Sequence, residues 1–99
     1  MKHHTYAQCM HAAANLIETK NTIITTSHKS RNQEITATIA DMLSNSSCNY
    51  SINIKENTIK SVENKNGWIK IMSISMYESR HRQGDFQGLR NLTFLNTYE

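Results

Sequence analysis

The sequence predicts a small α+β domain that consists of an N-terminal helical hairpin, a three-stranded antiparallel meander and a short C-terminal helix. Apolar residues recur at helical spacing through the first half of the chain. After Cys48 they alternate with polar residues, which is the period of a half-buried strand. Because 99 residues are few for two domains, a single domain over residues 1–99 is expected.

The first helix is expected from about Thr5 to Lys20. Thr5 and Gln8 have capping-box spacing, in which both side chains satisfy free amides at the helix start. The β-branched run at residues 22–26 can end this helix, extend it weakly or form a short strand, and we expect a frayed helix end. The side chains predicted to form the apolar stripe, with Cys9 and Leu16 beside it, are Tyr6, Met10, Ala13 and Ile17.

A second helix is expected after a loop at residues 27–30. Ser30 and Gln33 repeat the capping-box spacing. The segment 45–47, Asn-Ser-Ser, should end the helix because these side chains compete for backbone hydrogen bonds. The two helices together make the predicted hairpin. Its core-facing residues should be Ile35, Ile39, Met42 and Leu43.

Three strands are expected next, the first with Tyr50, Ile52 and Ile54 on one face. A turn at 56–57 returns the chain along 58–63, and the Asn-Gly at the end of 64–67 supplies the positive φ values of a hairpin. Trp68–Tyr77 should be one long strand. Its apolar residues change parity near Ile71, which predicts a bulge or a strand covered on both faces.

The tail is expected to begin with a polar loop over residues 79–84 and to end in a short helix. Gly88 weakens that helix. The residues spaced for its apolar stripe are Phe86, Leu89, Leu92 and Leu95.

The charge pattern does not decide which class of partner the protein binds. The net charge is +3, and basic residues alternate with acids along much of the chain, so a phosphate partner is permitted but not required. Without a signal-peptide pattern or a membrane-length apolar segment, we expect a cytoplasmic protein with reduced Cys9 and Cys48 and no membrane partner. The bias towards Asn, Ile, Ser, Thr and Lys suggests an AT-rich source such as a phage or plasmid.

No motif fixes a reaction, a metal or a cofactor, and we expect none of the three. His3, His4, Cys9 and His11 are possible metal ligands, but the second ligand pair typical of zinc sites is missing. A glycine-flanked serine and a glycine-rich phosphate loop are also missing. The catalytic alternative is a small hydrolase or nuclease built around His81.

The leading expectation is a non-enzymatic regulator, inhibitor or adaptor that binds another protein or a second copy of itself. It depends on the apolar groups on both parities of the last strand, because one side of that strand would stay uncovered in a monomer. The residues expected to contact the partner are Trp68, Met72, Met76 and Tyr77.

The alternative is a nucleic-acid-binding regulator that uses a basic loop and a sheet face. Arginine in a loop can hold phosphates with two hydrogen bonds, and an exposed sheet can support RNA. The candidate contacts are Lys60, Lys70, Arg80, Arg82 and Arg90.

Overall fold

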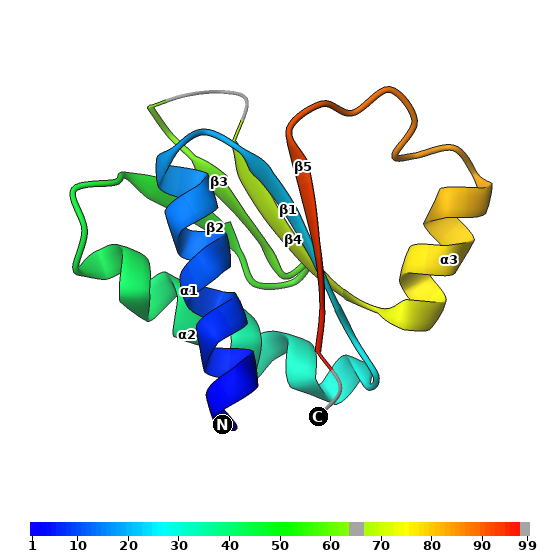
Figure 1. Cartoon of the computed structure of the whole chain (residues 1–99), viewed down its shortest axis with the longest axis horizontal. Coiled ribbons are helices and arrows are strands. Elements are labelled where there is room, and N and C mark those ends of the chain that lie inside the picture. The colour runs from blue at the N-terminus through cyan, green and yellow to red at the C-terminus, as the bar shows by residue number, and fades with distance from the viewer. Residues whose placement is uncertain (64–66, 98–99) are drawn as a thin grey trace.

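The structure is a computed structural model that describes residues 1–63 and 67–97. In these residues it contains three α-helices, one short 3-10 helix and five strands (Figure 1). In chain order they are α1 (His3–Ile17), β1 (Asn21–Thr26), η1 (Lys29–Arg31), α2 (Asn32–Ser44), β2 (Tyr50–Asn53), β3 (Thr58–Ser61), β4 (Trp68–Ser73), α3 (Ile74–Arg82) and β5 (Leu92–Asn96).

The strands form one mixed sheet in the order β2-β3-β4-β1-β5. β2, β3 and β4 are antiparallel neighbours, whereas β1 is parallel to both β4 and β5. The α+β class is confirmed. The predicted three-stranded meander is only part of the sheet, because β1 and β5 add two strands. A short strand at residues 22–26 was one of the alternatives, whereas β5 was not predicted.

The central strand β1 occupies the segment predicted as a frayed helix end. All of residues 22–26 are buried. Ile24 joins the core beneath α1 and α2, and Ile23 points to the opposite face of the sheet. A β-branched run covered on both faces is the pattern of a buried parallel strand. The predicted hairpin of consecutive helices is therefore wrong, although α1 and α2 do pack side by side (Figure 1).

Helix α1 presents a different face to the core from the predicted one. Tyr6, Met10 and Ile17 are exposed. The predicted capping box is absent as well, because the helix starts at His3 and its N-cap residue, Lys2, makes no side-chain cap. Small residues on the buried face allow close approach to α2 and the sheet, and this packing determined the rotation of the helix. The buried residues are Thr5, Cys9, Ala12, Ala13, Asn15 and Leu16.

Helix α2 matches the prediction closely. Ile35, Ile39 and Leu43 are buried, and the helix ends at Ser44, next to the predicted stop. Its start differs, since a 3-10 turn leads into it and no side chain caps it, so the predicted capping box at Ser30 is not formed.

Strand β4 ends at Ser73, well before the predicted end at Tyr77. The Ser73 hydroxyl accepts a hydrogen bond from the backbone N–H of Met76, which caps α3. Ile74 and Met76 therefore belong to a helix, and the change in apolar parity marks this transition rather than a bulge. The predicted loop at 79–84 is largely the second half of α3.

The chain after α3 ends in β5 instead of the predicted helix. Positive φ values at Gly84, Gly88 and Asn91 break any helix there. β5 pairs with β1, and the Thr25 hydroxyl donates a 2.9 Å hydrogen bond to the Asn96 side chain. Most of the predicted turn at 64–67 lies outside the described residues.

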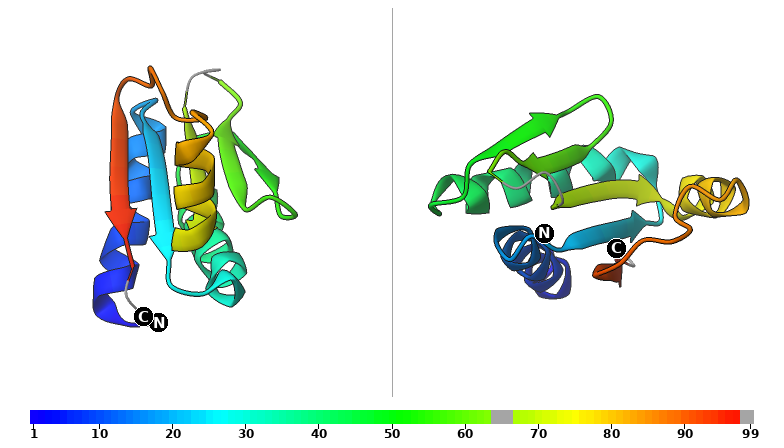
Figure 2. Two further views of the ribbon diagram at one scale, coloured as in Figure 1. Left: turned by 90° about the vertical axis from the view of Figure 1, so that its right-hand side faces the viewer. Right: turned by 90° about the horizontal axis from the view of Figure 1, so that it is seen from above.

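The main core lies between the sheet and the layer formed by α1 and α2, whereas α3 lies on the opposite side of the sheet (Figure 2). None of the helices in the described part of the chain has the length and apolarity needed to cross a bilayer. The core residues are Cys9, Ala12, Ala13, Leu16, Ile24, Ile35, Ile39, Leu43, Ile59, Ile69 and Ile71.

Candidate functional site

The chain leaves the two central parallel strands in opposite directions. β1 leads to η1 and α2 on one face of the sheet, and its neighbour β4 leads to α3 on the other (Figure 2). Adjacent strands connected to opposite faces leave a crevice at their carboxyl ends, and open sheets that contain parallel strands bind ligands at such a point. The candidate site lies there.

A cavity of about 320 Å³ opens at this point. Its walls come from the segment after β1, from the turn between β2 and β3, and from the end of β4 with α3. Five of the lining residues are basic and one is acidic, so the cavity is strongly cationic. The charged lining residues are Lys29, Lys55, Glu56, Lys60, Lys70 and Arg80.

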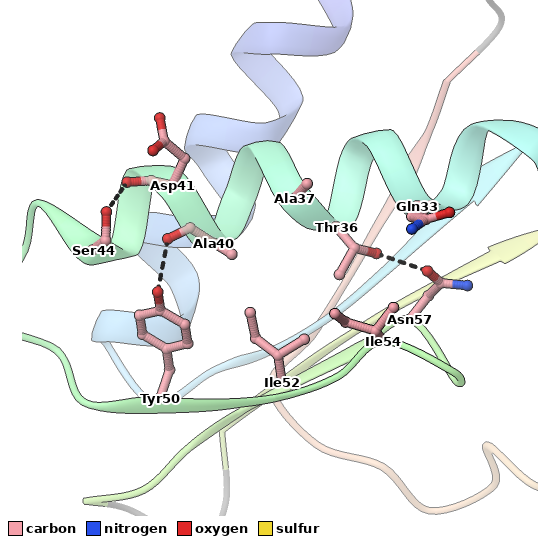
Figure 3. Close-up of a pocket in the computed structure, with 10 residues that line it drawn as sticks. All are labelled: Gln33, Thr36, Ala37, Ala40, Asp41, Ser44, Tyr50, Ile52, Ile54 and Asn57. Carbon is pink, nitrogen blue, oxygen red and sulfur yellow. Dashed lines mark hydrogen bonds between the residues drawn. The ribbon is translucent and has the colours of Figure 1, made fainter.

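The turn between β2 and β3 reaches the cavity because β3 runs antiparallel to β4. Thr58, at the start of β3, lies opposite Lys70 in the ladder. The backbone N–H of Ile71 donates a 3.0 Å hydrogen bond to the carbonyl of Asn57. The Thr36 hydroxyl donates to the Asn57 side chain over 3.2 Å, which ties this turn to α2 (Figure 3).

Lys60 and Lys70 lie on the sheet face that α3 partly covers. Ile59 points into the core on the other face, so Lys60 points away from α1 and α2. Lys60 pairs with Trp68 across the ladder. The Lys70 ammonium nitrogen lies 4.8 Å from the centroid of the Trp68 ring.

The position of Lys70 lowers the pKa of its ammonium group. Burial is the main cause, followed by the positive charges of Arg80 and Lys60, while Asp85 and Glu56 oppose the shift more weakly. Within the described residues, no salt bridge joins Lys70 to a carboxylate, and the Trp68 ring lies close enough for a cation–π interaction with its ammonium group.

Two helices begin at the cavity and add to its positive potential. Asn32 is the first residue of α2, and Ser73 is the N-cap of α3; both line the cavity. The positive ends of helix dipoles favour anions. Asn32 is buried, and its side chain accepts a hydrogen bond from the Thr26 hydroxyl, which fixes the start of α2 to the end of β1.

The cavity gathers three of the five basic residues predicted to contact nucleic acid, namely Lys60, Lys70 and Arg80. Arg82 lies at the exposed end of α3 and Arg90 lies before β5; neither lines the cavity. Lys29 and Lys55 were not among the predicted contacts. Lys29 begins the short helix η1 and Lys55 lies in the turn between β2 and β3, and in such short segments no periodicity reveals which face a side chain takes.

The four residues predicted to contact a protein partner do not form one exposed strand surface. Met72 is 6% exposed, and Trp68 is half-buried beneath Lys70. Met76 is 47% exposed but lines the basic cavity. Tyr77 packs against the rings of His81, Phe86 and Phe94, with centroid separations of 5.7, 5.5 and 4.8 Å. His81, the catalytic candidate, therefore belongs to an aromatic cluster.

A second hollow, of about 360 Å³, lies between α2 and β2 (Figure 3). Ile52 and Ile54 are 38% and 63% exposed at its edge, and the Tyr50 hydroxyl donates a 3.1 Å hydrogen bond to the carbonyl of Ala40. Asp41 is the one charged residue in its lining. This groove is mainly apolar and was not predicted as a site.

The cysteines of the described residues form no disulfide, and the cysteines and histidines do not gather into a metal-binding cluster there. Neither Cys9, which is buried, nor Cys48, which is partly buried, forms a disulfide. Burial, and then the nearby Glu63 carboxylate, raise the pKa of the Cys48 thiol, which disfavours its reactive thiolate. No group of three or more His, Cys, Asp or Glu side chains in residues 1–63 and 67–97 is placed to hold a metal ion.

Comparisons with protein-family models, with curated proteins and with solved structures found no match for this chain. Its function is therefore argued from the cavity and the groove themselves.

Proposed function

We propose that the protein binds nucleic acid through phosphate groups held in the basic cavity. The observation that carries the proposal is the concentration of five basic side chains, from three separate segments, around a single cavity with one acid. Like charges gathered in this way repel one another in the free protein. A bound phosphate turns that repulsion into attraction and adds charge-assisted hydrogen bonds.

The neighbourhood of Trp68 favours a nucleic acid over a simple anion. The ring lies beside Lys60 in the ladder and beneath Lys70, so an aromatic group adjoins the phosphate-binding cations. Proteins that bind single strands combine such cations with aromatic rings on which bases stack. The free backbone N–H groups at the starts of α2 and α3 contribute in the same sense.

The test is a binding titration of a fluorescently labelled oligonucleotide at several salt concentrations. A variant that carries Lys60→Gln, Lys70→Gln and Arg80→Gln should bind at least about tenfold more weakly and show a shallower salt dependence, because each lost phosphate contact removes close to one unit from the salt slope. The matched control carries Lys2→Gln, Arg82→Gln and Arg90→Gln, which changes the net charge equally outside the cavity. It should keep most of the affinity.

Two results would reject the proposal. One is the absence of binding to single- or double-stranded oligonucleotides at low salt. The other is an equal loss of affinity in the cavity variant and in the control, which would assign binding to net charge alone.

Protein binding is the second candidate, with a second copy of the chain as the partner. β2 is an edge strand without a charged residue, and such an edge invites pairing. A two-fold antiparallel pairing centred on Ile52 sets Tyr50 of each copy opposite Ile54 of the other, so the contact is self-complementary.

Sedimentation over a range of concentrations tests this pairing. Ile54→Lys should keep the chain monomeric, whereas Val62→Lys, at a similarly exposed site of 61% beyond β3, should leave any dimer intact. A wild-type chain that is monomeric at all concentrations, or a dimer that survives Ile54→Lys, would reject the candidate.

A further inference from the structure

We infer that the basic cavity recognises a terminal phosphate, the phosphomonoester at the end of a nucleic-acid strand, rather than a phosphate within the backbone. This inference rests on the proposed function, since it names the part of the nucleic acid that the same site takes. The observation behind it is that the cations come from three separate segments of the chain and meet at one cavity of about 320 Å³, with Ile71 and Met72 in its lining on the sheet side.

The walls of the cavity favour a group attached on one side only. The start of α2, the turn between β2 and β3 and the start of α3 stand around it, and Ile71 and Met72 belong to its lining on the sheet side. A backbone phosphate is joined to sugars in two directions and needs a channel with two exits. A terminal phosphate needs one opening only.

The charge of the site also suits a terminal phosphate. A phosphomonoester carries close to two negative charges at neutral pH and offers three acceptor oxygens, whereas a backbone phosphate carries one negative charge. Five basic residues with one acid exceed what a single negative charge requires. Arg80 can hold two of the oxygens with paired N–H groups, and the lysines supply point charges for the third.

The size of the cavity indicates how much of the strand enters. A volume of about 320 Å³ is at the lower end of the range for small-molecule sites, which is roughly 300–1,000 Å³. It has room for the phosphate and part of the nucleotide that carries it. Trp68 then lies beside the cation cluster, where the first base can stack.

The experiment compares oligonucleotides of one sequence that carry a 5′-phosphate, a 3′-phosphate or only hydroxyl ends. A fourth, one nucleotide longer with hydroxyl ends, controls for the added charge. One phosphorylated form should bind at least about tenfold more tightly than both hydroxyl forms. Lys70→Met and Arg80→Lys should each reduce that preference, whereas Arg82→Gln, on the same helix but outside the cavity, should retain it.

The outcomes separate this inference from the proposed function. If all four oligonucleotides bind with equal affinity, and the cavity variants weaken all of them, end recognition is overturned while nucleic-acid binding stands. If none binds at low salt, both proposals fail. A preference for one phosphorylated end that disappears in Lys70→Met and Arg80→Lys supports the inference and identifies the end.

Discussion

The ammonium nitrogen of Lys70 lies 4.8 Å above the ring of Trp68, two residues earlier on β4. Residues two apart on a strand point to the same face, so the sequence itself imposes this proximity. Burial and two neighbouring positive charges disfavour the charged form of Lys70. Within the described residues, no salt bridge to a carboxylate offsets this effect. Lys70, which lines the cavity, therefore lies next to an aromatic chromophore that we expect to respond to a bound anion.

Trp68 should report ligand binding directly, because it is the only tryptophan in the chain. A phosphate in the cavity draws the Lys70 ammonium towards itself and changes the polarity next to the ring. We expect the tryptophan emission to change with the same midpoint as the binding isotherm measured by anisotropy. Lys70→Met should remove most of the change while Arg82→Gln preserves it. An emission that stays constant at saturation would contradict the coupling.

The lowered pKa of Lys70 predicts a stability effect of defined sign. The charged form is less favourable in the folded chain than in the unfolded chain, so the penalty is fully present below the folded-state pKa. It disappears as pH rises towards the ordinary value of 10.5, at which the unfolded lysine titrates. Lys70→Met should therefore be more stable than wild type at neutral pH.

The measurement is the urea midpoint of both proteins at pH 7 and near pH 10. The advantage of Lys70→Met should shrink between these values. The control is Lys2→Met, at an exposed lysine near the N-terminus, and its stability relative to wild type should not change between the two pH values. An advantage that grows with pH would contradict the lowered pKa of Lys70. A variant less stable than wild type at neutral pH would show that the stem of Lys70 contributes more through packing than its charge costs.

Local patterns were sufficient for the elements whose partners are near in sequence. The spacing of Ile35, Ile39 and Leu43 located α2, and the alternation at Tyr50 and Ile52 located β2. The same reasoning brought Lys60 and Lys70 together, because both lie on one face of adjacent antiparallel strands. Such inferences need only the period of an element and a short turn.

Non-local pairing explains what the sequence did not reveal. β1 pairs with β4 and β5, which are more than forty residues away in the sequence. Neither the β-branched run of β1 nor the spacing of apolar residues in the tail predicts this pairing. Since β1 was not recognised as a strand, the crevice where β1 and β4 diverge could not be anticipated. Lys29 was missed for the same reason, since it lies on the wall formed by the segment after β1.

Asn57 should tolerate glycine better than alanine. Its φ of 50° is in the left-handed region, which costs an alanine about 1–2 kcal/mol and glycine little. Both substitutions lose the hydrogen bond from Thr36. In urea unfolding, the free energy of unfolding of Asn57→Ala should therefore be about 1 kcal/mol lower than that of Asn57→Gly. A variant order with alanine equal to or above glycine would show that the turn adopts another conformation in solution.

The position of Ile24 in the central strand gives a direct test of the fold. Its side chain is 0% exposed and belongs to the main core, so Ile24→Ala should cost about 2–5 kcal/mol. A domain of this kind is stable by only about 5–15 kcal/mol, so the urea midpoint should fall steeply. Ile54→Ala, at a side chain 63% exposed, should change the stability by about 0.5 kcal/mol or less.

The contrast between these two variants distinguishes β1 from the alternative that the local sequence favoured. In a frayed helix end, alanine has the higher helix propensity and the isoleucine has little core to lose, so Ile24→Ala would be neutral or stabilising. A large loss at Ile24 with none at Ile54 is the result expected if Ile24 is buried in the core beneath α1 and α2. Because Ile24 belongs to the main core and does not line the basic cavity, Ile24→Ala should weaken oligonucleotide binding only in proportion to the fraction of unfolded chain.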